Sequence, residues 1–182
     1  PEMIAPLAAA GGFSHVGVGG PKRCLGPLSS VPANPAARWW AFLHLCGADV
    51  FRASRAMKMD EKMCRTLIVY ESLFAYAPPR SMLELKSRLG RLPKFDFNAA
   101  AQALSVFAPG WKDAAVLYQK LCESGEPYRI SQLAVTAQEL TAAGVPARKM
   151  KGVLSQLLSA VQRTPALNTP AALLALARTL SA

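Results

Sequence analysis

The chain has 182 residues, of which 52% are hydrophobic and 18% are charged. A chain this apolar can bury a core, so the composition excludes an intrinsically disordered protein. Lys and Arg number 21 against 11 Asp and Glu, a formal net charge of +10, which favours an anionic partner. RNA, DNA and a membrane surface all fit that description, and charge alone does not choose among them.

The cysteines and the longest apolar runs exclude further classes of protein. The four cysteines lie far apart and never form a C-x-x-C pair, so we expect reduced thiols, no metal site and a cytoplasmic location. The cysteines are Cys24, Cys46, Cys64 and Cys122. We find no uninterrupted apolar run of the roughly 18 to 20 residues that a membrane-spanning helix needs, so we expect no membrane partner.

The first 34 residues are predicted to be rich in loops. A short helix is expected over residues 3–10 and ends at Gly11-Gly12, after which closely spaced glycines and prolines permit only loops and turns. Residues 17–22 are slightly similar to a phosphate-binding loop. They lack the G-K-[ST] ending and follow no strand, so we interpret them as an ordinary loop.

From residue 36 onward the apolar residues recur at helical spacing, and no stretch alternates as a strand does. We therefore predict an all-α, multi-helical fold without a sheet. Helices are expected at residues 36–46, 48–57, 60–77, 82–89, 97–107 and 111–122. Asp60 and Ser81 are suited to cap two of them. Trp39 and Trp40 are adjacent and cannot share one helix face, so we expect one in the core and the other partly exposed.

Residues 124–127, which read SGEP, predict a boundary between a helical body domain at 1–124 and a helical tail domain at 125–182. In the tail, Thr136 and Glu139 have the spacing of a capping box that begins a short helix. Gly144 ends that helix, and Pro146 leads into a longer one. A last amphipathic helix is expected over residues 171–180.

We find no group of residues that is typical of an enzyme. The two histidines have no carboxylate partners at ligand spacing, no D-x-D pair occurs, and no serine lies in a G-x-S-x-G context. The sequence therefore predicts no catalytic residue, and we expect the chain to be inactive by itself. His44 is interpreted as an ordinary helix residue close to the core.

The basic residues are more informative. Residues 80–94 hold five basic side chains against a single acid, and no acid follows Glu139. Arg148, Lys149 and Lys151 have the strongest claim to a function because they follow the start of a helix, where free amides and the helix dipole favour a phosphate. A solvated helix face is the alternative for any one of them. We find no aromatic motif for stacking bases, so RNA would be bound through its backbone and shape.

Four segments together resemble the body and tail of class II CCA-adding tRNA nucleotidyltransferases of the Firmicutes type. They read IAPLAAAGGF at residues 4–13, RWWAFLH at 38–44, LAVTAQEL at 133–140 and PALNT at 165–169. The resemblance implies a multi-helical elongated array, body plus tail, that holds the acceptor and T-arm of tRNA by phosphate contacts. It differs from the family pattern at Ala147 and Lys151, where glycine is common.

The resemblance also implies a separate N-terminal catalytic head, in cis or in trans, that adds CMP and AMP to the tRNA 3′ end. Mg, CTP and ATP would bind that head, because its D-x-D and nucleotide-binding motifs have no counterpart in this sequence, and no cofactor is expected here. The candidate tRNA-binding residues are Gly144, Arg148, Lys149, Lys151, Arg91, Lys94 and Arg129. The alternative function is a non-catalytic all-α protein-interaction module whose basic surface serves solubility or an acidic partner.

Overall fold

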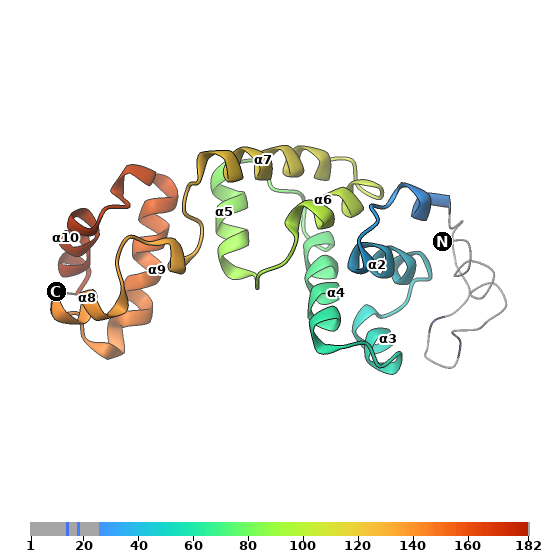
Figure 1. Ribbon diagram of the computed structural model, residues 1–182, viewed down its shortest axis with the longest axis horizontal. Coiled ribbons are helices and arrows are strands. Elements are labelled where there is room, and N and C mark those ends of the chain that lie inside the picture. Colours follow the sequence, from blue (N-terminus) through green and yellow to red (C-terminus); the bar gives the residue numbers. More distant parts are fainter. Residues whose placement is uncertain (1–13, 15–17, 19–25, 182) are drawn as a thin grey trace. The chain divides into compact units, whose positions relative to one another are not determined.

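The structure, a computed structural model, describes residues 14, 18 and 26–181 (Figure 1). In this part of the chain it contains nine α-helices, three short 3₁₀ helices and no strand, which confirms the all-α prediction. The expected helix over residues 3–10, the segment 4–13 and nearly all of the glycine-rich run 17–22 lie outside the described residues.

The contacts divide the chain into two compact units. The first unit comprises Pro1–Pro79 and Lys94–Val116, and the second comprises Arg80–Pro93 and Leu117–Ala182. The contacts therefore group residues 80–93 with the C-terminal helices. The division into domains at 1–124 and 125–182 stays a prediction.

In the first unit, helix α2 (Pro35–Leu45) packs against three of the other helices. The elements of this unit are η2 (Gly26–Ser30), α2, α3 (Val50–Ala56), α4 (Glu61–Phe74), α6 (Phe97–Ser105) and the first turns of α7 (Trp111–Ser124). Helix α2 packs against α3, α4 and α6. Trp40 is completely buried on α2 whereas Trp39 is partly exposed, which confirms that only one of the two tryptophans belongs to the core.

Side-chain caps fix where the helices of the first unit begin. Asn34, Asp49, Asp60 and Asp96 each accept a hydrogen bond from a backbone N–H three residues later. These bonds satisfy amides that have no partner inside the helix. The cap expected at Asp60 is thereby confirmed.

Aromatic rings pack around Trp40 and place His44 among them. The His44 ring stacks on Trp40 with centroids 5.1 Å apart and meets the rings of Phe74 and Phe107 edge to face. His44 therefore packs close to the core, as the sequence predicted.

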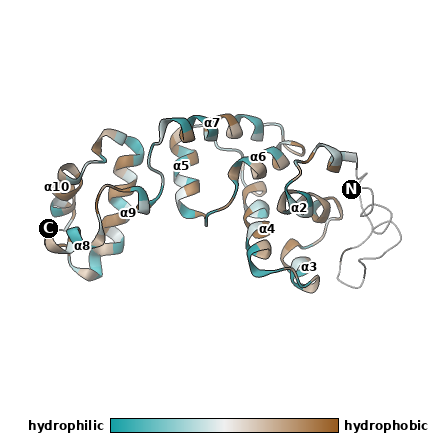
Figure 2. Cartoon of the chain, in the orientation of Figure 1, coloured by the Kyte–Doolittle hydropathy of each residue, from teal (hydrophilic) through white to brown (hydrophobic). Residues whose placement is uncertain are grey.

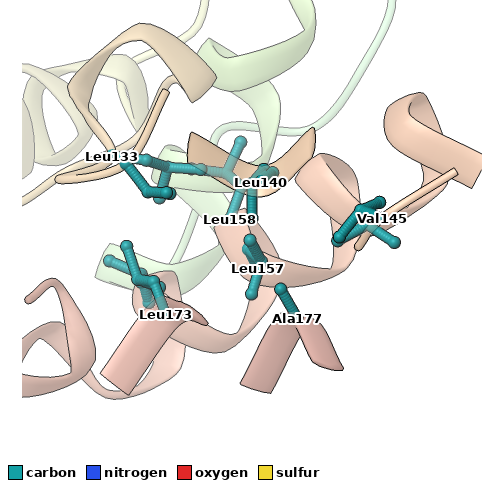
Figure 3. Packing of buried hydrophobic residues seen from close by; sticks show 10 residues of the cluster. Leu133, Leu140, Val145, Leu157, Leu158, Leu173 and Ala177 are labelled. Atoms are coloured by element: carbon teal, nitrogen blue, oxygen red, sulfur yellow. The ribbon is translucent and has the colours of Figure 1, made fainter. Parts of the chain in front are cut away.

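The second unit contains the remaining helices. They are α5 (Met82–Arg91), the end of α7, η3 (Ile130–Gln132), α8 (Ala137–Ala142), α9 (Ala147–Arg163), η4 (Pro165–Leu167) and α10 (Pro170–Ser181). Leucines and valines from the segment before α8 and from α8, α9 and α10 form one core cluster (Figure 3). Hydrophilic and hydrophobic residues both occur along α9 (Figure 2), and its buried apolar residues recur at the three- to four-residue spacing of an amphipathic helix. They are Val153, Leu157, Leu158 and Val161.

The turn from α8 to α9 is closely specified by its sequence. The Thr136 hydroxyl accepts from the Glu139 N–H, and the Glu139 carboxylate accepts from the Thr136 N–H at 2.7 Å, which confirms the capping box. At the other end of α8, the Val145 N–H donates to the Leu140 carbonyl. The intervening Gly144 has a φ of +94°, a left-handed conformation that glycine adopts without strain.

A buried polar seam joins α5 to α9 within the second unit. Lys86 is only 2% exposed; its ammonium contacts the Glu126 carboxylate and donates to the Gln162 carbonyl at 3.2 Å. The Gln162 amide donates to the Tyr128 carbonyl at 3.3 Å. Gly90 lies at the same seam, where an added Cβ would come within 2.6 Å of the Tyr128 oxygen. One basic residue of the 80–94 cluster is therefore a buried structural group rather than part of a charged surface.

Candidate nucleic-acid interface

The C-terminal helices α9 and α10 contain no carboxylate side chain. No Asp or Glu follows Glu139 in the chain, whereas five basic residues do. All five are exposed. They are Arg148, Lys149, Lys151, Arg163 and Arg178. With no acid to neutralise them, these side chains give this surface a positive potential that attracts anions.

The start of α9 adds backbone donors to that charge. Its N-cap, Pro146, supplies no side-chain hydrogen bond, and its first turn holds no acid. The described residues provide no acceptor for the Ala147 and Arg148 N–H groups, while the Lys149 N–H donates to the Pro146 carbonyl. Free amides and the positive end of the helix dipole therefore lie beside the basic side chains.

Arg148 and Lys151 are the side chains best placed to contact an anion. They lie three residues apart on α9, so their side chains emerge on the same side of the helix. Both are exposed, and neither forms an ion pair with any described residue. Their guanidinium and ammonium donors are available to two neighbouring phosphates.

Lys149 has a different environment. Its ammonium donates to the Ser181 carbonyl at 2.7 Å, at the C-terminal end of α10. A cation is favoured at that end of a helix by the dipole. Lys149 therefore links the start of α9 to the end of α10, and only part of its donor capacity remains for a ligand.

The structure distributes the remaining candidate residues over several environments. Arg91 is exposed in the last turn of α5, and Lys94 is exposed in the first unit. Arg129 donates to the carbonyls of Leu92 and Pro93 at 2.9 and 3.2 Å, so its guanidinium is used to hold the chain that follows α5. Gly144 has no heavy atom within 4 Å of the position of an added Cβ, so a ligand can approach its backbone.

Two acids of the second unit, Glu139 and Glu84, are fixed by local hydrogen bonds. The Thr136 N–H holds the pKa of the Glu139 carboxyl below its ordinary value of 4.5, with a smaller contribution from the Thr136 hydroxyl. On α5, the Arg80 N–H and the Arg88 side chain likewise lower the pKa of Glu84. Both carboxylates are therefore ionised at neutral pH.

Sequence reasoning missed the role of Lys86 and Glu126. Lys86 stands beside Leu85 and three residues before Leu89, both buried, and that spacing is the available signal that it faces inward. Its partner Glu126 lies in the segment between α7 and η3, and no local pattern reveals that pairing.

Neither a metal centre nor a membrane-spanning helix is found in the described part of the chain. No three His, Cys, Asp or Glu side chains gather there in a way that could hold a metal ion. None of the helices at 26–181 has both the length and the hydropathy needed to cross a bilayer.

Comparison with known proteins adds no relative: the sequence matches no family model and no curated protein, and the fold matches no solved structure.

Proposed function

We propose that this chain is the tRNA-binding body and tail of a CCA-adding tRNA nucleotidyltransferase. It holds the acceptor and T-arm through phosphate contacts, while a catalytic head in cis or in trans adds CMP and AMP. In this proposal Mg, CTP and ATP bind the head, and the residues described above supply affinity and position only.

The observation that carries the proposal is the carboxylate-free surface of α9 and α10. A folded domain normally mixes both signs of charge on its surface, and a region of single sign favours a partner of opposite charge. The first turns of α9 carry two basic side chains without an ion pair, Arg148 and Lys151, and two N–H groups without a described acceptor. Phosphate groups are the anions that such an arrangement binds best.

Two of the four segments that resemble the enzyme family, 133–140 and 165–169, are in contact with each other in the second unit. The Asn168 side chain, from PALNT, accepts from the Ala134 N–H and donates to the Gln132 carbonyl. Leu133, Val135 and Leu140, from LAVTAQEL, belong to the core on which α9 lies. These two segments therefore help to support the helix that carries the basic residues, which favours the proposed architecture for this part of the chain.

The salt dependence of RNA binding tests this proposal. We would measure the affinity of the chain for a tRNA acceptor/T-arm minihelix over a series of salt concentrations. Replacing Arg148 or Lys151 with alanine should weaken binding and reduce the slope of log K against log salt by about 0.7 to 0.9 for each lost phosphate contact. Lys149→Ala should have a smaller effect because its ammonium is bonded to Ser181.

Lys112→Ala is the matched control. Lys112 is exposed at the start of α7 in the first unit and forms no ion pair with a described residue, so this variant loses the same charge elsewhere. Equal effects of Arg148→Ala and Lys112→Ala would mean that only net charge matters. That result would contradict the assigned surface and favour the protein-interaction module.

A further inference from the structure

A groove with a volume of about 410 Å³ lies between α3 and α4 in the first unit. Its apolar walls include Val50, Phe51, Ile68 and Ala75, and Asp49 and Glu71 also line it. Phe51 is 50% exposed, so its ring is accessible from solvent. The groove takes no part in the proposed RNA contacts, since its two carboxylates repel phosphate.

Glu71 is held in a fixed position in this groove. The indole N–H of Trp40 donates to Glu71 Oε2 at 2.8 Å, and Trp40 itself is completely buried. Among the described residues no cation lies within ion-pair distance of Glu71, and its other oxygen has no hydrogen-bond partner there. The carboxylate is therefore preorganised, with one oxygen available to a ligand.

The other charges near the groove are already paired. Asp49 accepts from the Arg52 N–H, and its second oxygen lies 3.6 Å from Arg52 Nε. The Arg55 guanidinium lies 5.4 Å above the Phe51 ring and pairs with Glu61. Glu71 is thus the uncompensated charge of the groove, and it is negative in a chain whose net charge is +10.

We propose that the α3–α4 groove binds an arginine side chain from a basic segment of a partner protein. Arginine combines an apolar stem with a planar cationic head that stacks on aromatic rings and binds carboxylates. Its stem packs against Ile68 and Phe51, and its guanidinium donates to the free oxygen of Glu71. The complementarity of charge selects this occupant, because an acidic or phosphorylated segment would place like charges together.

Nuclear magnetic resonance of the ¹⁵N-labelled chain tests the proposal, with the indole N–H signal of Trp40 as the reporter. The probe is the blocked tripeptide acetyl-Ala-Arg-Ala-amide. The control probe replaces arginine with citrulline, which has nearly the same shape but no charge. We expect a saturable shift with the arginine peptide and binding about two- to fivefold weaker with the citrulline peptide, as for a partly exposed ion pair.

Two variants of the chain complete the experiment. Glu71→Gln keeps an acceptor for Trp40 but removes the charge, so it should abolish the preference for arginine over citrulline. Phe51→Ala removes a half-exposed wall and should weaken both peptides while the fold persists. Glu123→Gln loses the same charge in α7 of the second unit and should bind like the unmodified chain.

Equal binding of the two peptides, or a preference that survives in Glu71→Gln, would overturn the proposal. The absence of a saturable Trp40 shift with the arginine peptide would overturn it as well. If Glu71→Gln fails to fold, judged by circular dichroism, Phe51→Ala and the comparison of the two peptides still decide the question.

Discussion

The side chain of Asn168 accepts a hydrogen bond from the Ala134 backbone N–H at 2.8 Å and ties the segment before α8 to the segment before α10. Asn168 also donates to the Gln132 carbonyl at 3.1 Å. One amide side chain therefore satisfies two backbone groups, one at the end of η3 and one in the segment before α8.

Replacing Asn168 with alanine should destabilise the chain by about 1 to 2 kcal/mol, because the partly buried bond to the Ala134 N–H and the exposed bond to the Gln132 carbonyl are both lost. Urea unfolding followed by circular dichroism measures this loss. Asn98→Ala is the control, since Asn98 is exposed on α6 and accepts only from Gln102. Equal stability of the two variants would show that the Asn168 bonds contribute nothing.

Two glycines in helices should respond to alanine in opposite directions. At Gly90 the new Cβ would lie 2.6 Å from the Tyr128 oxygen, so Gly90→Ala should destabilise the chain by about 1 to 3 kcal/mol. Gly152 lies on the exposed side of α9, and an added Cβ there would have no neighbouring atom within 4 Å outside its own helix backbone. Gly152→Ala should therefore stabilise the chain by about 0.5 to 1 kcal/mol. Thermal unfolding of both variants checks the signs, and a stabilised Gly90→Ala would refute the close approach of α5 to Tyr128.

The buried contact of Lys86 with Glu126 predicts a measurable coupling. Lys86→Met shortens the side chain by one heavy atom and leaves Glu126 without its cation, and should cost about 2 to 4 kcal/mol. Glu126→Gln in the same chain should recover part of that loss, because it removes the uncompensated charge. A double-mutant cycle in urea gives the coupling free energy, and simple additivity of the two changes would exclude a direct interaction.

The capping box of α8 predicts how stability depends on acid. The pKa of Glu139 in the folded chain is lowered from 4.5, chiefly by the Thr136 N–H. Its contribution is therefore complete above the unfolded pKa and is lost as the pH falls through the lower folded value.

Glu139→Gln isolates this contribution, because glutamine can also accept from Thr136 but does not titrate in this range. The unmodified chain should exceed the variant in free energy of unfolding at pH 7, and the difference should shrink at pH 3. An unchanged difference at the two pH values would show that Glu139 does not contribute through its charge.

The sequence was most informative where structure is decided by near neighbours. Asp60 and the pair Thr136 and Glu139 form the caps that their spacing predicted, because a cap acts over only three residues. Helical periodicity likewise indicated the helix of Leu157 and Val161, both fully buried. The sequence also indicated that the basic residues after Glu139 are exposed, since a charged residue that lacks an acidic neighbour is normally solvated.

Contacts between distant residues could not be predicted from one sequence. The Glu71 carboxylate is held by Trp40, 31 residues away, and Lys86 contacts the Gln162 carbonyl across 76 residues. Arg129 carries a guanidinium, a group that commonly binds phosphate, yet this guanidinium donates to two backbone carbonyls. Such assignments depend on how helices pack, which periodicity leaves undetermined.

The most direct test of the account is a comparison of two RNAs at one fixed moderate salt concentration. One is the acceptor/T-arm minihelix, and the other is a plain RNA duplex with the same number of phosphates. If the surface of α9 and α10 recognises tRNA, the chain should bind the minihelix clearly more tightly, and Arg148→Ala should reduce that preference. Equal or negligible binding of the two RNAs would contradict the proposed function.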